Sequence, residues 1–357
     1  MIHQGEGYLI EIESLVKSQF PNLLDEYVNQ KIIIVVDENT HDCCLDYLIT
    51  HFPQLESAEI MLLPTGEENK VLEICYQVWT ALLEYKVGRS DLIINLGGGV
   101  VTDVGGFIAS VYKRGISFVH IPTTLLGMVD ASIGGKTGVD LENVKNVIGS
   151  FANPKAIFID PVFLETLPGE EIYNGYAEML KHALILDSSH WDKIKEILQE
   201  TDLTTQANIS HSIQLKLYIV TQDPNETGLR KLLNFGHTVG HALESYFLGT
   251  SPISHGHAVA LGIIAESFIS FRRGILPEAM YVEIEKTIIR SFPMIVIPEN
   301  AIEAIIGFAF NDKKNVKNEL RFVLLEKIGQ AQIDAIFTTA EMGNALLYLT
   351  LLAEAKN

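Results

Sequence analysis

The chain has 357 residues, of which 47% are hydrophobic and 20% are charged. A chain of this length and composition can fold as two globular domains with sizeable cores, which excludes a disordered or fibrous protein. Its 45 acidic and 26 basic residues give a formal net charge of −19. That charge argues against nucleic acid and anionic membranes as partners, so an anionic ligand would need a local group of basic residues.

Localisation is predicted from the N-terminal segment and the cysteines. The first 20 residues carry acidic side chains where a signal peptide has a basic segment followed by an apolar one. No apolar run approaches the roughly 18 residues of a membrane span. Only three cysteines are present, too few for a disulfide scaffold. Together these features predict a cytoplasmic protein with reduced cysteines.

The first half of the chain alternates between short apolar runs and segments with helical spacing. Strands are predicted at 31–36, 58–63, 91–96, 116–121 and 156–160, and helices at 70–86 and 102–112. This alternation is typical of a parallel sheet covered on both faces. The glycine-rich segment 132–138 is interpreted as a flexible glycine frame on which Lys136 contacts phosphate or substrate, and a surface loop with a solvated lysine is the less favoured alternative. The end of this segment resembles a Walker A loop, but the glycine required five positions before Gly135 is Asp130, so the P-loop pattern fails.

From about residue 168 the apolar residues recur mainly at helical spacing. Helices are predicted at 169–186, 190–199, 203–222, 229–248, 255–272, 277–291, 299–308 and 338–353, with a small strand pair at 320–325 and after Gly329. The sequence therefore predicts an α/β domain at 1–168 and a mostly α-helical domain at 169–357.

A glycine turn follows the predicted strand 91–96. Gly97, Gly98 and Gly99 lead directly into the predicted helix. Glycines let the backbone approach a ligand, and the N–H groups at a helix start attract a phosphate. The spacing differs from G-x-G-x-x-G, so a tight turn without a ligand is the alternative.

Four histidines are concentrated in two segments. His237 and His241 are four residues apart and share a helix face, and His255 and His257 follow. This concentration favours a metal site or acid–base chemistry over isolated helix histidines, and Glu178 and Glu244 are candidate carboxylate partners. Basic residues near these segments indicate a substrate with two negative charges, although helix-surface salt bridges are an alternative for some of them.

Several ordered motifs resemble the 3-dehydroquinate synthase family between about residues 31 and 330. They are PTGEENK (64–70), LGGGVVTD (96–103), PTTLLGMVDASIGGKTGV (122–139), VKNVIG (144–149), GYAEMLK (175–181), ETGLRKLLNFGHTVGH (226–241) and DKK (312–314).

The resemblance implies a Rossmann-like NAD-binding N-terminal domain, a helical C-terminal domain for metal and substrate, and an active site in the cleft between them. It also implies a homodimer. The expected enzyme is a carbon–oxygen lyase of the shikimate pathway of aromatic amino acid biosynthesis. It converts 3-deoxy-D-arabino-heptulosonate 7-phosphate, an anionic sugar-acid phosphate, into 3-dehydroquinate and phosphate. The implied cofactors are NAD, regenerated in each turnover, and a divalent metal, with zinc preferred and cobalt possible.

The resemblance also implies residue roles. The metal ligands are Glu178, His237 and His255. The NAD-binding residues are Asp37, Asn39, Glu67, Lys70, Gly98, Gly99, Val100, Asp103, Thr123 and Thr124, together with Lys136 and Lys145. The catalytic and substrate-binding residues are Asp130, Lys136, Lys145, Asn146, Lys181, Lys216, Glu226, Arg230, Asn234, His241 and Lys313, with Arg114 reaching the phosphate bound by a second subunit.

Within that set, His241 is expected to shuttle protons, with Glu226 as an acid–base partner. His257 departs from the family, which usually has glutamate there, and His257 is therefore an alternative metal ligand. Three alternative functions remain: a related sugar-phosphate cyclase whose substrate lacks a carboxylate, a metal-dependent NAD alcohol or glycerol dehydrogenase, and a non-catalytic dinucleotide-binding regulator.

Overall fold

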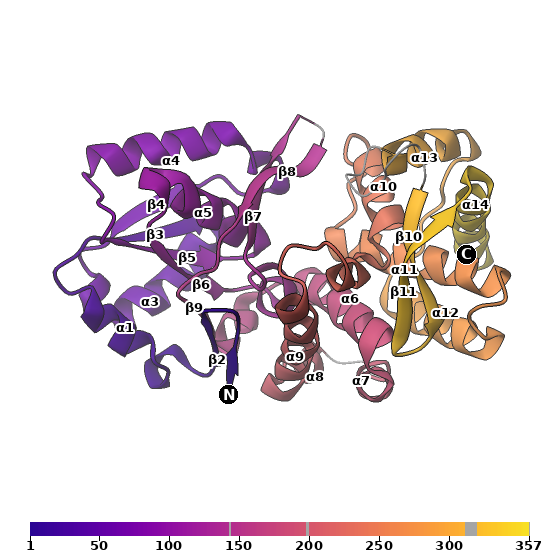
Figure 1. Ribbon diagram of the computed structural model, residues 1–357, viewed down its shortest axis with the longest axis horizontal. Coiled ribbons are helices and arrows are strands. Elements are labelled where there is room, and N and C mark those ends of the chain that lie inside the picture. The colour runs from indigo at the N-terminus through magenta and orange to yellow at the C-terminus, as the bar shows by residue number, and fades with distance from the viewer. Residues whose placement is uncertain (143, 198–199, 311–319, 357) are drawn as a thin grey trace. The chain divides into compact units, whose positions relative to one another are not determined.

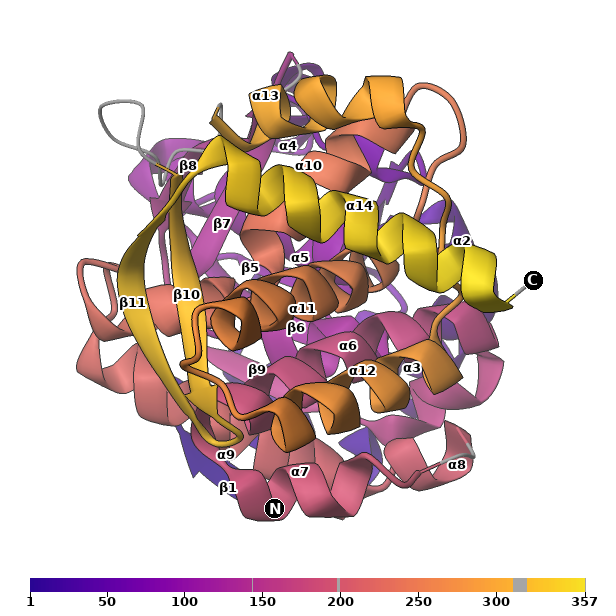
Figure 2. The same ribbon diagram turned by 90° about the vertical axis from the view of Figure 1, so that its right-hand side faces the viewer.

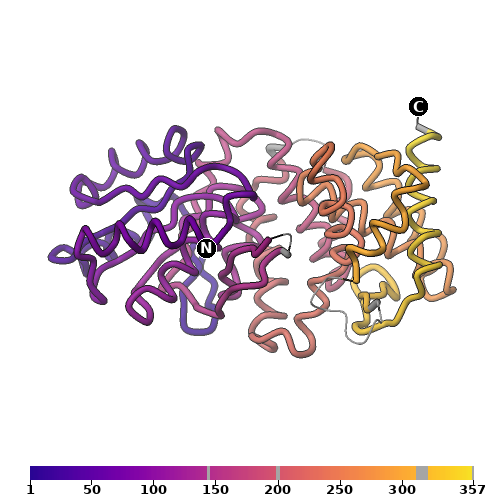
Figure 3. The backbone as a smooth tube through the Cα atoms, turned by 90° about the horizontal axis from the view of Figure 1, so that it is seen from above, coloured from indigo at the N-terminus to yellow at the C-terminus, as the bar shows by residue number. Residues whose placement is uncertain are grey.

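The structure is a computed structural model that describes residues 1–142, 144–197, 200–310 and 320–356 (Figure 1). The chain forms two compact units. The first comprises Met1–Ile172 with Thr204–Leu217, and the second comprises Tyr173–Leu203 with Tyr218–Asn357. The course of the chain through both units can be followed in Figure 3.

The first unit is built on a sheet which, among the described residues, has seven strands in the order β1-β2-β9-β6-β5-β3-β4. The strands are β1 (Ile2–Gln4), β2 (Leu9–Ile12), β3 (Ile32–Asp37), β4 (Glu59–Leu63), β5 (Leu92–Gly97), β6 (Ser117–Pro122) and β9 (Ala156–Ile159). All pairs are parallel except β1 with β2. The five predicted strands are confirmed. The short strands β1 and β2 were not predicted, because three or four residues carry too little pattern.

Helices cover both faces of this sheet, as predicted (Figure 1). On one face lie α4 (Leu72–Glu84) and α5 (Gly99–Val111), and buried side chains of both helices join those of β3 and β5 in one hydrophobic core. On the other face lie α1 (Phe20–Glu26) and α3 (Asp46–His51). There Phe20 packs edge-on against Phe52 and against Phe158 of β9. The central strands are therefore apolar on both sides, which explains their continuous runs of Ile and Val.

The surface-loop alternative for 132–138 does not hold for the second half of the segment, which begins a strand. Strand β7 (Lys136–Leu141) pairs antiparallel with β8 (Val144–Phe151). Gly138 and Gly149 are opposite each other, and a Cβ on Gly149 would lie 2.3 Å from the Thr137 carbonyl oxygen. The glycines that indicated a loop therefore permit two backbones to approach closely.

The second unit is mostly helical. Its helices are α6 (Gly169–Leu186, which begins in the first unit), α7 (Ser188–Ile194), α8 (Glu200–Leu203), α10 (His237–Phe247), α11 (His255–Arg272), α12 (Glu278–Ser291), α13 (Ile302–Phe310) and α14 (Thr339–Lys356). Helix α9 (Gln206–Gln222) is divided between the units, and β10 (Leu320–Lys327) pairs with β11 (Gln330–Phe337) as predicted. Helix α11 lies among α12, α14 and β10 (Figure 2), and it is buried on nearly all sides.

The predicted helix 229–248 is also wrong, because it is interrupted. A 3₁₀ helix spans Leu229–Asn234, and α10 begins only at His237. Between them Gly236 has φ of +77°, a left-handed conformation that an α-helix cannot contain and that glycine adopts without a Cβ clash. His237 is consequently the first residue of its helix.

Close packing of α10 against α11 predicts a large effect for one substitution. In Gly262→Ala the new Cβ would lie 1.9 Å from the Gly236 carbonyl oxygen, so the backbone must move. We expect a loss of about 2 kcal/mol or more in the free energy of unfolding. In the control Gly307→Ala, within α13, no atom lies within 4 Å, and alanine should stabilise by about 0.5–1 kcal/mol. Urea unfolding checks both variants, and a wild-type midpoint for Gly262→Ala would contradict the packing argument.

None of the helices in the described part of the chain is long and apolar enough to span a membrane.

Candidate active site

The predicted NAD-binding residues gather at one edge of the first unit's sheet. From β3 the chain continues to β4 on one side and then returns to place β5 on the other side of β3. In parallel α/β sheets ligands bind at such a reversal, beside the carboxyl ends of the strands. Asp37 ends β3 and caps α2 (Glu38–Thr40), which contains Asn39. Gly98 directly follows β5.

The glycine turn after β5 fits an anionic ligand. Gly98 is the N-cap residue of α5, and no side chain caps the N–H groups of the first turn. The helix then continues through Gly99, Val100 and Asp103. A Cβ on Gly98 would lie 2.9 Å from Cγ2 of Thr124, a residue of the segment after β6 that also contains Thr123. The structure therefore brings these predicted residues together.

An ion pair joins two further residues of this set. The Lys70 ammonium lies 2.5 Å from the Asp103 carboxylate, and Lys70 is only 3% exposed. Burial opposes the charge on Lys70, but the carboxylates of Asp103 and Glu67 outweigh burial and raise the pKa of the ammonium. The pair ties the segment after β4 to the first turns of α5.

The basic residues among the predicted substrate contacts of the first unit form ion pairs or have exposed side chains. Lys216, in α9, pairs with Asp130 at 2.8 Å. Lys145 lies 3.5 Å from Glu67. The side chains of Lys136, at the start of β7, and Arg114, in the 3₁₀ helix Tyr112–Arg114, are exposed.

Asp140 is a residue in this region that sequence reasoning missed. Its carboxylate accepts the backbone N–H of Asn146 at 2.6 Å, where Asn146 has φ of +51°. Its own N–H donates to the Lys70 carbonyl oxygen at 2.7 Å. Asp140 therefore holds the β7–β8 turn, and with it Lys145 and Asn146, next to the Lys70 segment. An acidic residue shortly before a tight turn was the available signal.

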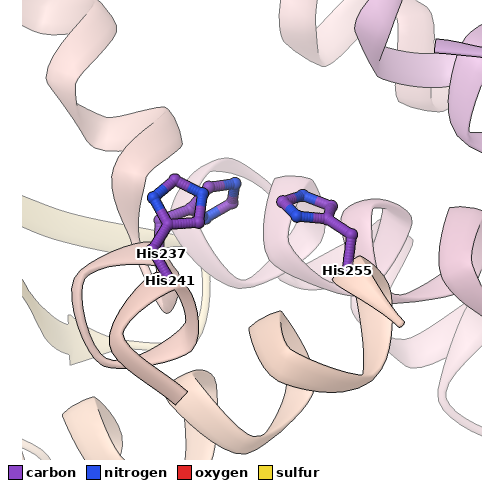
Figure 4. Close-up of side chains that lie close together, drawn as sticks. All are labelled: His237, His241 and His255. Carbon is purple, nitrogen blue, oxygen red and sulfur yellow. The ribbon is translucent and has the colours of Figure 1, made fainter. Parts of the chain in front are cut away.

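The second unit contains a cluster of imidazoles and one carboxylate. Ring nitrogens of His237, His241 and His255 lie within 4.8 Å of one another. Figure 4 shows these rings, two from α10 and one from the start of α11. Oε1 of Glu178, in α6, lies 3.4 Å from Nε2 of His237 and 3.6 Å from Nε2 of His255. Tetrahedral ligands at zinc–ligand distances are roughly 3.3 Å apart, so the predicted set of Glu178, His237 and His255 fits a metal ion.

Hydrogen bonds orient two of these rings. Nδ1 of His237 lies 3.0 Å from the Phe235 carbonyl oxygen, to which it can only donate, so Nε2 is left as the ligand atom. Nδ1 of His255 lies 3.5 Å from Oε2 of Glu244. Glu244, a candidate carboxylate in the sequence, thus contacts the far side of the His255 ring.

The charges around Glu178 keep it ionised. Its side chain is fully buried and forms an ion pair with Lys181, one turn further along α6. Burial alone would raise its pKa, but the Lys181 ammonium outweighs burial and holds the pKa well below its usual range. Burial lowers the pKa of His237 to about 3, so this imidazole is neutral and able to ligate.

The alternative that His257 is a ligand is not supported. His257 Nε2 lies 2.6 Å from the carbonyl oxygen of Pro293, and its ring stacks on Phe292. It is absent from the groups of metal-binding side chains found among the described residues. His257 lies two positions after His255 in α11, so its side chain points to another side of the helix.

A loop before α10 carries the remaining predicted residues. Arg230 is 2% exposed, and its Nη1 donates to the Pro224 carbonyl oxygen at 2.5 Å. Asn234 Nδ2 donates to Oε1 of Glu226 at 2.8 Å. Asp223, which sequence reasoning did not single out, organises the loop by accepting the N–H groups of Thr227, Gly228 and Arg230. The predicted substrate residue Lys313 lies outside the described residues.

The Asp223 hydrogen bonds predict an acid-sensitive loop. Burial alone would raise the pKa of Asp223, but the backbone N–H groups outweigh burial and lower it from the usual 3.8 to about 2. The stabilisation is therefore complete above about pH 4 and is lost as the pH falls towards 2. Asp223→Asn should lower the free energy of unfolding at neutral pH, and its difference from the wild type should shrink over this window. Urea unfolding between pH 7 and 2 measures this difference in the free energy of unfolding. A difference that does not change with pH would contradict the role given to the ionised Asp223 carboxylate.

Comparisons with solved structures define the class to which this fold belongs. The structure of 2-epi-5-epi-valiolone synthase from Streptomyces hygroscopicus, with NAD+ and Zn2+ bound, superimposes with a TM-score of 0.84, at 28% identity over 98% of both chains. A 2-deoxy-scyllo-inosose synthase matches with a TM-score of 0.83 at 22% identity, over 97% of this chain and 99% of that one. The predicted fold class, a Rossmann-like α/β region followed by a largely helical one, is confirmed.

The sequence comparisons identify the family. Sequence models of the 3-dehydroquinate synthase N-terminal and C-terminal regions match residues 60–174 and 175–315. The 3-dehydroquinate synthase of Parabacteroides distasonis is 37% identical over 93% of this chain and 94% of its own. That of Clostridium botulinum is 38% identical over 91% and 94%. This chain belongs to the 3-dehydroquinate synthase family.

Proposed function

We propose that this protein is a 3-dehydroquinate synthase, a lyase that converts 3-deoxy-D-arabino-heptulosonate 7-phosphate into 3-dehydroquinate and phosphate. Beyond membership of the family, the observation that supports it most is the cluster of His237 and His255 around the fully buried Glu178 carboxylate. When bound, NAD+ supplies a reversible hydride acceptor, and the divalent metal polarises substrate oxygens. Zinc is the proposed metal, because the donors are one carboxylate and two imidazoles, and cobalt suits the same donors.

In this proposal, the segment 1–168 binds the dinucleotide and the segment 169–357 binds the metal. Asp37 contacts a ribose of NAD, and the α5 N-terminus with Gly98 and Gly99 receives the pyrophosphate. Lys70 and Asp103 hold the segments around it. The remaining cofactor contacts are assigned to Asn39, Glu67, Val100, Thr123, Thr124, Lys136 and Lys145.

The substrate roles follow from charge. Arg230 and Lys216 bind the carboxylate, whereas Lys136, Asn146 and Arg114 bind the phosphate. His241 lies beside the two ligating imidazoles, with its ring 5.2 Å from that of His237, and it accepts and returns the substrate's proton. Glu226, hydrogen-bonded to Asn234, is its acid–base partner. The other proposed substrate contacts are Asp130, Lys145, Lys181, Asn234 and Lys313.

We further propose a homodimer that works in the cytoplasm. Support for a reducing compartment comes from Cys43, Cys44 and Cys75, which are free thiols. Light scattering tests the dimer.

The deciding experiment measures phosphate release from 3-deoxy-D-arabino-heptulosonate 7-phosphate with substoichiometric NAD+, with and without a chelator. Chelator-sensitive release without accumulation of NADH, with dehydroquinate as the product, is expected. Accumulation of NADH on simple alcohols would instead identify a dehydrogenase. Turnover of glucose 6-phosphate in place of the keto acid would identify a cyclase whose substrate lacks a carboxylate.

A further inference from the structure

Glu266 is a fully buried carboxylate that the proposed function does not use. It lies in α11, three turns after His255, and is 0% exposed. Its Oε2 accepts the N–H of Gly236 at 2.8 Å, and its Oε1 accepts the N–H of Val239 at 3.3 Å. These donors belong to the start of α10, whose N-cap residue is a glycine without a capping side chain. Glu266 therefore caps α10 from a neighbouring helix.

The capped turn is the one that sets the position of His237. Gly236 lies between Phe235, whose carbonyl oxygen accepts from the His237 ring, and His237 itself. The hydrogen bond to the Gly236 N–H therefore fixes both neighbours of Gly236: His237, which carries the ring, and Phe235, whose carbonyl oxygen orients that ring. The second bond, to Val239, fixes the first turn of the helix that also carries His241.

Helix α11 therefore contributes twice to the imidazole cluster. Its first residue is His255, and Glu266 holds the helix that supplies the other two rings. Carboxylate oxygens suit this place, because the N–H groups at the N-terminus of a helix need acceptors and carry positive partial charge. The close approach of α10 and α11 at Gly236 and Gly262 brings the two helices near enough for this contact.

We propose that Glu266 is a positioning residue for the metal site, which acts through the α10 N-terminus on His237 and His241. The proposal rests on the metal assignment made under the proposed function. It predicts that a variant in which residue 266 has only one oxygen acceptor binds the metal more weakly, even though Glu266 is not a ligand.

The test uses Glu266→Gln in the full chain, because a glutamine side chain has nearly the same shape but can accept only one of the two N–H groups. Asp160→Asn is the matched control. Asp160 is also buried, and it accepts the N–H groups of Leu15 and Val162 in the first unit. Co2+ is the probe: its affinity is measured by chelator competition, its geometry by visible absorption, and folding by circular dichroism.

We expect Glu266→Gln to bind Co2+ about 10- to 100-fold more weakly than the wild type, with a changed absorption spectrum. Asp160→Asn should lose thermal stability yet keep the wild-type affinity and spectrum. Wild-type affinity and spectrum in Glu266→Gln would overturn the proposal. A wild-type protein that does not bind Co2+ would overturn the metal assignment itself.

If Glu266→Gln does not fold, Glu266→Asp replaces it, because aspartate keeps the charge but withdraws the carboxylate from α10. The gain in the free energy of unfolding on adding a fixed concentration of Co2+, measured by urea unfolding, is then compared with that of the wild type. This gain depends on the Co2+ affinity and not on starting stability, so a reduced gain supports the proposal and an unchanged one overturns it.

Discussion

Glu178→Gln is expected to lose its metal and its activity together. The side chain is fully buried, and Oε1 is within 3.4 Å and 3.6 Å of the Nε2 atoms of His237 and His255. Loss of a residue that merely orients a ligand costs about 10- to 100-fold in metal affinity, so loss of a ligand should cost at least about 100-fold. The measurements are zinc content after dialysis and the rate of phosphate release. A variant with full metal content and full activity would remove Glu178 from the metal site.

The same substitution removes the carboxylate that forms an ion pair with the buried Lys181 ammonium. Breaking a buried ion pair on one side costs about 3–5 kcal/mol, so the variant should also be less stable. The double variant Glu178→Gln with Lys181→Met separates the two effects, because it should regain stability but not metal. Glu244→Gln is a milder control, since Glu244 contacts His255 at 3.5 Å from the far side of the ring and should keep part of the affinity.

Arg230→Lys is expected to lower kcat/KM for the keto-acid phosphate by about 10²- to 10³-fold. Lysine keeps the charge but loses the two-pronged geometry that matches a carboxylate, and it cannot reproduce the bond from Nη1 to Pro224. Since Arg230 is 2% exposed, water does not easily replace the lost contact. Steady-state kinetics measure the effect, and NAD+ and metal affinities should be unchanged.

Lys231→Ala supplies the matched control for this prediction. Lys231 is the adjacent cation, but it is about a third exposed and pairs with Asp334 at 2.9 Å. Its loss should change kcat/KM less than about threefold. Equal kinetic effects at both positions would show that the loss is not specific to the Arg230 guanidinium, and would contradict carboxylate recognition by Arg230.

The sheet was the most predictable part of this fold. Strands β3, β5, β6 and β9 are mostly buried apolar runs, and β4 is an apolar run with Ile60 and Leu62 exposed. Such runs stand out without an alignment. The β7–β8 hairpin was hidden because its glycines serve close strand pairing instead of a loop. The break before α10 was hidden for another reason: the apolar spacing continues through the two residues whose backbone interrupts the helix, Phe235 with ψ of 129° and Gly236 with φ of +77°.

The candidate site was predictable where side chains act directly and unpredictable where they act through the backbone. His237, His241 and His255 stood out by residue type and by spacing. Asp140, Asp223 and Glu266 did not, because each works by accepting backbone N–H groups, and Glu266 does so from another helix. Any acidic residue can take that role, so nothing in the one-dimensional pattern separates Asp223 and Glu266 from the other acidic residues of the chain, and Asp140 is marked only by its place shortly before a turn.

The division of α9 between the two units has a consequence for biosynthesis. The first unit contains Thr204–Leu217, and this segment supplies Lys216 to Asp130 and Ser210 to His3. A ribosome must therefore translate past residue 217 before the first unit has all its parts, although its sheet is complete at Ile159. During translation, the sheet of the first unit would therefore be complete before Thr204–Leu217 is synthesised, because Tyr173–Leu203 of the second unit comes first. A gene split after codon 172 should yield an incomplete first fragment, which co-expression of the remainder would have to complement.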